Sequence, residues 1–187
     1  MELDMSKLPG ILLIVGSGLF MIAAFLPITV AFVQGDTKAL RDAPGAWAGA
    51  SLLFVLGTLV TGAGLGLLAT QVGTGGAAVA YVSVALFVAA AVFWAVITYL
   101  RLALPIEQVL ASPTFGWPFV AYTLLMNGAL IGMGSALLLA DYPRWIGWAT
   151  VGLPMALAVT YLVAKDMPPF AHFGVTLALG VALLVLR

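Results

Sequence analysis

The chain has no cysteine, one histidine and few charged residues. Without cysteine there is no disulfide, no thiolate metal site and no thiol redox chemistry. His172 is the single histidine, so a haem held by two histidines of one chain is excluded. Seven basic and seven acidic residues give a formal net charge of zero, so no basic surface for nucleic acid is expected.

Most residues of the chain are apolar. Hydrophobic residues make up 64% of the 187 residues and charged residues 7%, where soluble domains carry about 25% charge. A spanning helix needs about 20 apolar residues. The composition therefore predicts an all-α fold, a single-domain polytopic transmembrane bundle of six helices, with the lipid bilayer as its first partner.

The six predicted spans lie between short polar loops. They cover residues 8–33, 45–70, 77–100, 115–140, 144–163 and 170–186, with the charged residues at their ends or between them. The first run is too long for the apolar segment of a signal peptide, about 7–15 residues, so it is expected to remain as a helix. Pro27 is expected to kink that helix, and Pro154 the fifth.

The two membrane faces carry nearly equal numbers of basic residues. The near face holds both termini and the turns between spans 2 and 3 and between spans 4 and 5, and the far face holds the other three loops. Because the near face has three basic residues and the far face four, the positive-inside rule leaves the orientation open. In the longest far-face loop, Ile106, Val109 and Leu110 have helical spacing beside Glu107 and Gln108. This pattern predicts a short amphipathic helix lying in the interface.

Small residues recur at every fourth position in the second and fourth spans. In a bilayer such stripes let two helix backbones approach closely. The positions expected to pack helices together are Thr58, Gly62 and Gly66, and then Gly128, Gly132 and Ala136. The two segments match at an offset of seventy residues, which suggests a parallel repeat of the two helices. Chance similarity is the alternative in a chain this rich in leucine, alanine and glycine.

Chemistry-bearing residues are scarce inside the predicted spans. No lysine, arginine, aspartate or glutamate is expected at mid-depth, so a pump or proton relay is disfavoured. No metal, nucleotide or catalytic motif is present, and no catalytic residue, metal or cofactor is predicted. Asn127 either orients a ligand or bonds a neighbouring helix. His172 is expected to be an interfacial histidine at the start of the last span.

Aromatic residues concentrate in the third of the membrane nearest the far face. Such residues commonly form a belt at the head groups. The alternative is a pocket beneath the loop between spans 3 and 4. Its candidate residues are Trp47, Trp94, Tyr99, Arg101, Glu107, Trp117, Tyr122, Asn127, Tyr161 and His172.

The stretch DYPRWIGW, from Asp141 to Trp148, resembles a Pro-Arg-Trp-x-Gly-Trp turn of small bacterial six-helix membrane proteins of unknown function. The resemblance covers one turn and the general layout. It implies a multi-pass protein of the bacterial inner membrane, and it carries no functional residues over to this chain.

Two functional hypotheses follow from these patterns. The first is a non-catalytic accessory or scaffolding subunit that packs against another membrane protein or a second copy of itself. The alternative is a small-molecule binding or transport component, because six helices in this length also resemble the substrate-capturing subunits of vitamin transporters. An enzyme that acts on lipid at the far face is a third and weaker reading, so the sequence leans against catalysis.

Overall fold

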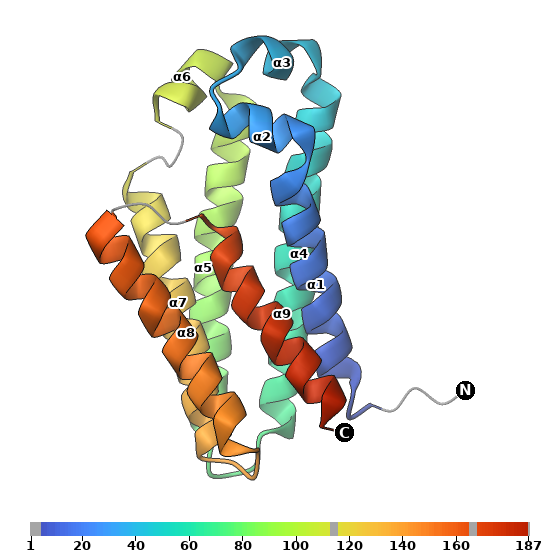
Figure 1. Ribbon diagram of the computed structural model, residues 1–187, viewed down its shortest axis with the longest axis vertical. Coiled ribbons are helices and arrows are strands. Elements are labelled where there is room, and N and C mark those ends of the chain that lie inside the picture. Colours follow the sequence, from blue (N-terminus) through green and yellow to red (C-terminus); the bar gives the residue numbers. More distant parts are fainter. Residues whose placement is uncertain (1–4, 113–115, 165–167, 187) are drawn as a thin grey trace.

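The computed structural model describes residues 5–112, 116–164 and 168–186, which form helices joined by short turns (Figure 1). Five of these helices are long and apolar enough to cross a membrane. They are α1 (Leu8–Phe25), α4 (Pro44–Gln71), α5 (Ala77–Ala103), α7 (Trp117–Leu138) and α8 (Arg144–Ala164). A shorter apolar helix, α9 (Phe170–Val185), follows them. The all-α prediction is confirmed, and so is the presence of several helices compatible with a multi-pass membrane protein.

The boundaries of five predicted helices, the second to the sixth, agree with the structure within three residues wherever the chain is described. The predicted start of the fourth span at Phe115 lies outside the described residues. Pro154 lies inside α8, which continues past it to Ala164.

The first predicted span is wrong in length, because α1 ends at Phe25 instead of continuing to Val33. Leu26 has an extended backbone with ψ of 142°, and Pro27 begins a separate helix, α2 (Pro27–Val33). Proline has no N–H for the helix ladder, and its ring disfavours helical geometry in the residue before it. The expected kink is therefore a complete break, after which α2 lies across the end of the bundle (Figure 1).

Three short helices form a cap over the upper ends of α4 and α5 (Figure 1). The cap consists of α2, α3 (Thr37–Asp42) and α6 (Ile106–Ala111). The helix α6 confirms the predicted amphipathic segment, but its apolar side contacts protein. Val109 is fully buried in a cluster with Ile28, Phe32, Leu40, Trp47 and Ala50. The exposed side chains of Arg41 and Glu107 form an ion pair that joins α3 to α6.

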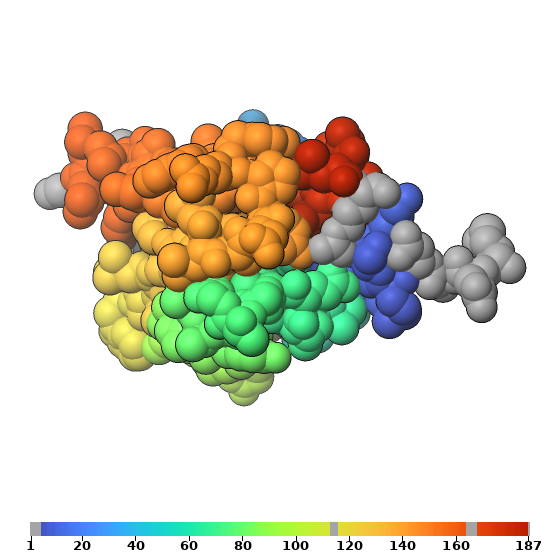
Figure 2. Space-filling view, turned by 90° about the horizontal axis from the view of Figure 1, so that it is seen from below, coloured from blue at the N-terminus to red at the C-terminus, as the bar shows by residue number. Residues whose placement is uncertain are grey.

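The long helices pack against one another in neighbouring pairs. Helix α1 packs against α4 and α9, α5 against α7, and α7 against α8. Figure 2 shows the end opposite the cap, where the turn between α4 and α5 lies beside the turn between α7 and α8. The first turn of α1 lies against the last turns of α9, with Gly10 facing Gly180 and Leu184.

The backbones of α1 and α4 approach each other closely. A Cβ atom added to Gly57 would lie 2.7 Å from the carbonyl oxygen of Gly16 and 2.7 Å from the backbone nitrogen of Phe20. Gly64, seven residues after Gly57 on α4, faces Leu13 of α1. This seam runs beside the predicted stripe of α4, not along it.

The predicted packing residues on α4 occupy different environments. Thr58 is buried, and its hydroxyl donates to the carbonyl of Phe54 at 2.8 Å. Gly62 faces the ring of Phe87 on α5, whereas Gly66 has no atom within 4 Å of the position a Cβ would take.

On α7 the predicted stripe faces α5. Gly128 lies near Leu86, Gly132 lies against Ser83, and the carbonyl of Ala136 lies against Gly76 just before α5. A different glycine of α7, Gly134, meets Gly147 of α8. Helix α7 therefore packs closely on both sides.

We expect Gly57→Ala to destabilise the protein, because its new methyl group would overlap backbone atoms of α1 that have no flexible end to move. Overpacking of this kind typically costs about 1–3 kcal/mol. The matched control on the same helix is Gly66→Ala, which adds a methyl group in open space and removes the helix cost of glycine. Thermal unfolding in detergent should show a lower Tm for Gly57→Ala alone. Equal Tm values would contradict the seam.

Candidate functional site

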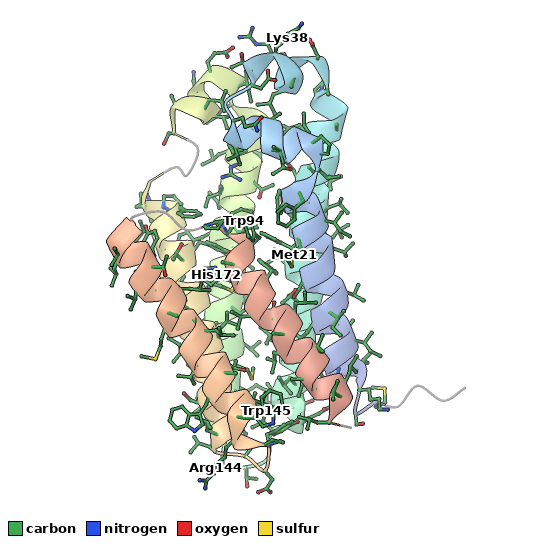
Figure 3. All side chains as sticks on the ribbon, viewed as in Figure 1. Met21, Lys38, Trp94, Arg144, Trp145 and His172 are labelled. Carbon is green, nitrogen blue, oxygen red and sulfur yellow. The ribbon has the colours of Figure 1, made fainter. Side chains whose placement is uncertain are left out.

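A cavity of about 500 Å³ lies beneath the cap. Its walls come from α1, α2, α4, α5, α6, the first turn of α7 and the start of α9. The lining residues are Phe20, Ala24, Thr29, Phe32, Val33, Gly35, Phe54, Trp94, Arg101, Leu110, Phe119, Pro168, Pro169 and Phe170. In Figure 3, Trp94 and His172 lie between the cap, marked by Lys38, and the opposite end, marked by Arg144 and Trp145.

The break after α1 makes room for this cavity. Had α1 continued straight to Val33, its last two turns would have stayed beside α4. Instead α2 turns away and places Phe32 and Val33 on the cavity wall. The start of α9 supplies Phe170 to the same space. The cavity is thus bounded by a helix break and a helix start, where side chains do not interlock as they do along two parallel helices.

Aromatic rings from α1, α4 and α5 form the inner wall of the cavity, and a ring of α9 packs behind them. Phe20 of α1 lies with its ring centroid 4.7 Å from Phe54 of α4 and 5.5 Å from Trp94 of α5. On its other side Phe20 stacks on Phe173 of α9, with centroids 3.7 Å apart and planes 11° apart. Aromatic pairs of this kind contribute about 0.5–1.5 kcal/mol beyond their buried area. This wall is therefore a well-ordered surface.

Arg101 is the one charged side chain among the described residues that line the cavity. Its guanidinium carbon lies 5.0 Å from the ring centroid of Phe32 and 5.4 Å from that of Trp94. These distances are within the range of cation–π attraction. The backbone carbonyl of Arg101 also accepts a long hydrogen bond of 3.5 Å from the indole of Trp47. The cation is thus fixed between two rings, one from the cap and one from the bundle.

Buried polar groups lie behind the aromatic wall. The rings of Trp94, Tyr122 and His172 follow one another with centroid distances of 5.1 Å and 5.8 Å, and none is more than 2% exposed. Among the described residues the Trp94 indole N–H and the Tyr122 hydroxyl have no hydrogen-bond partner. Neither nitrogen of His172 meets hydrogen-bond geometry among the described residues, although the backbone of Pro169 lies close to the ring. Such unpaired groups cost about 1–3 kcal/mol each.

Asn127 lies one turn beyond this group on α7 and is 5% exposed. Its amide nitrogen donates to the carbonyl of Thr123 at 2.9 Å, within its own helix. Its side-chain oxygen has no partner among the described residues. Among the described residues, the hydrogen bond of this side chain is therefore intrahelical, unlike the interhelical bond that the sequence suggested. Side-chain bonding between helices occurs elsewhere, between the hydroxyls of Ser17 on α1 and Thr176 on α9, 2.7 Å apart.

The structure gathers part of the predicted pocket. Trp94 and Arg101 line the cavity, and Tyr122 and His172 lie directly behind Trp94. Trp47 is buried in the cap against Phe32, with ring centroids 4.9 Å apart.

The remaining predicted pocket residues lie elsewhere. Glu107 pairs with Arg41 on the outer surface of the cap. Tyr99 and Trp117 are 68% and 70% exposed, as the aromatic-belt alternative expects. Tyr161 packs partly buried against the core. His172 lies at the start of α9, as expected, and its side chain is fully buried inside the bundle. Its position at a membrane interface stays a prediction.

Sequence reasoning missed the phenylalanines of the cavity. Phe20, Phe32, Phe54 and Phe119 look like ordinary apolar residues of spanning helices, so nothing in their local pattern marks them. The available signal was Pro27, which predicted a bend at the level where Phe32 leaves the bundle axis.

Comparison with known protein families, curated proteins and solved structures finds no match to this chain. Among the described residues, no three histidine, cysteine, aspartate or glutamate side chains gather where they could hold a metal ion. The cavity and its aromatic wall are therefore the features on which a function can be argued.

We expect Val109→Ala to loosen α6, because the lost methyl groups are fully buried under the cap. Burial of each methylene contributes about 0.8 kcal/mol, so the loss is about 1–2 kcal/mol. Hydrogen exchange of α6 amides should become about tenfold faster, while exchange in α5 and α7 stays unchanged. The control is Gln108→Ala, whose side chain is exposed. Equal exchange in both variants would contradict the burial of α6.

Proposed function

We propose that the protein is a binding component for an amphipathic small molecule, which occupies the cavity beneath the cap. The observation that carries this proposal is the cavity itself, about 500 Å³ with aromatic walls and, among the described residues that line it, one cationic side chain. Ligand sites are typically concave, about 300–1,000 Å³, mostly apolar and furnished with a few polar groups. A role in capture or transport of such a molecule follows from the same site.

We expect the ligand to enter this cavity through the cap. Helix α2 is joined to α1 through the extended residue Leu26, and α6 is held by Val109 and by the exposed pair of Arg41 and Glu107. Exposed ion pairs contribute about 0–1 kcal/mol, so the outer edge of the cap is weakly fastened. A ligand arriving from the membrane would need to displace only these short helices.

An accessory subunit is the second candidate, and one observation favours it. Gly66 lies on α4 with nothing within 4 Å of its Cβ position, and Thr70, the next residue of the stripe, is exposed. A groove of this kind would admit a helix of another membrane protein or of a second copy. The glycine- and threonine-lined part of α4 is then the docking surface. The possible repeat of α4 and α7 stays a prediction.

We also propose that α9 is a sixth crossing, in a bacterial inner membrane. It has 16 residues, about 24 Å long, against a hydrocarbon core of about 30 Å. Its pairing with α1 along the bundle supports this assignment. Local thinning of the bilayer accommodates such a difference at modest cost.

Native mass spectrometry after gentle detergent extraction tests the function. We expect one bound small molecule per chain, lost in Ala24→Phe because the new ring fills the cavity that Ala24 lines. The control is Ala95→Phe, at a similar depth on the exposed face of α5. A protein partner without a small molecule would favour the accessory subunit. An adduct equally retained in both variants would contradict binding in the cavity.

Single-cysteine labelling tests the number of crossings, since the natural chain has no thiol of its own. Six crossings place Ser6→Cys and Leu186→Cys on one side of the membrane and Lys38→Cys on the other. In sealed vesicles of one orientation, a membrane-impermeant maleimide should label either the first two variants or the third. Labelling of Leu186→Cys together with Lys38→Cys would show that α9 does not cross.

A further inference from the structure

We propose that the face opposite the cap holds a second binding site, for the head group of a lipid that carries a primary ammonium and a phosphate. The site is a pocket of about 510 Å³ bounded by the two turns of Figure 2 and by the end of α9. Its described lining consists of Gln71, residues 73–75 and 139–143, Leu183 and Leu186. None of these residues lines the cavity beneath the cap, so the two sites are separate.

Three helices end at this pocket. Gln71 is the last residue of α4, and Leu139 directly follows α7. Leu183 lies in the last turn of α9, and Leu186 directly follows that helix. No described residue of α1, α5 or α8, which begin on the same face, lines the pocket. Carbonyl groups at a helix C-terminus lack intrahelical partners and carry partial negative charge, so the pocket favours a cation.

The pocket contains hydrogen-bond acceptors without a matching cation. Asp141 lines it with an exposed carboxylate that forms no ion pair with a described residue. No described backbone N–H donates to the carbonyls of Thr74, Leu139 and Ala140, which line the same pocket. The last turns of α4, α7 and α9 contain no basic residue, and the described lining has no lysine or arginine. A cationic ligand would therefore be the one positive charge within the described walls.

A primary ammonium fits these acceptors better than other cations do. It carries three N–H donors, so it can bond to a carboxylate and to backbone carbonyls at once. A trimethylammonium has the same charge but offers no N–H donor. A hard metal ion takes six to eight oxygen ligands or keeps its own waters, and Asp141 is the one carboxylate among the described lining residues.

The surroundings of the pocket indicate a lipid as the source of the ammonium. Leu139, Leu183 and Leu186 give the pocket an apolar side, which a free amine would leave unused. Arg144 begins α8 directly after the lining residues, is exposed, and pairs with no described carboxylate. Figure 3 shows it at this end of the bundle. Arginine binds phosphate through charge-assisted hydrogen bonds. A zwitterionic head group with adjoining ammonium and phosphate therefore matches Asp141 and Arg144 together.

The test is native mass spectrometry of the full-length protein in detergent, titrated with dioleoyl phosphatidylethanolamine or dioleoyl phosphatidylcholine. The two probes share their chains and phosphate and differ in the hydrogens or methyl groups on nitrogen. We expect the natural protein to bind the ethanolamine lipid about fivefold more tightly, the scale of an exposed ion pair. Asp141→Asn should reduce this preference to less than twofold. The control Asp42→Asn, an exposed carboxylate on the cap, should retain it.

Arg144→Gln separates the phosphate from the ammonium. We expect it to weaken both lipids by a similar factor of about two to five and to leave the preference between them unchanged. Binding of both lipids at the natural affinity in this variant would overturn the role of Arg144.

Three further results would overturn the site itself. The first is equal affinity of the two lipids for the natural protein, a comparison that needs no variant to fold. The second is a full preference in Asp141→Asn. The third is displacement of the ethanolamine lipid by glycerophosphoethanolamine at equal concentration, which would show that the head group binds without its chains. Retention of the preference in Asp141→Glu, which keeps the charge, would support a carboxylate contact.

Discussion

The missing N–H of Pro27 is the constraint on which the architecture of the far face depends. A continuous first helix would have carried Phe32 and Val33 along α4 and left no room beneath a cap. Because Leu26 takes an extended backbone instead, α2 crosses the end of the bundle and meets α3 and α6. The cavity, the contact of Phe32 with Arg101 and the burial of Val109 all follow from that one change of direction.

Close backbone contacts hold the long helices together. In lipid, apolar side chains gain little by leaving the acyl chains, so dispersion between tightly packed backbones carries much of the packing. Gly16 and Gly57 allow this between α1 and α4, and Gly134 and Gly147 allow it between α7 and α8. Larger side chains take over towards the cap, where Phe20, Phe54 and Trp94 replace the glycines.

The unpaired polar groups behind the aromatic wall are hard to explain as packing alone. Tyr122 and His172 give up hydrogen bonds with water and gain ring contacts with each other and with Trp94. Phenylalanine at these positions would fill similar space without that cost. Their position next to the cavity fits a site where a ligand or bound water supplies the missing partners.

The sequence by itself determined the class of fold, the approximate ends of most long helices and the short helix α6. Hydrophobic runs of spanning length and charges confined to their ends are local properties, so they can be read without knowing which helix neighbours which. Trp94 and Arg101 could also be singled out, because an aromatic and a cation near one helix end are a visible pattern.

Only the tertiary structure decided which faces of those helices meet. A run that is apolar on every side does not show which of its faces packs against a neighbour. The sequence therefore pointed to the stripe of small residues on α4, whereas the contact with α1 passes through Gly57 and Gly64 beside it. The same ambiguity hid the burial of His172 and the gathering of phenylalanines from five different helices. Contacts between residues far apart in the chain depend on crossing geometry, which hydropathy does not encode.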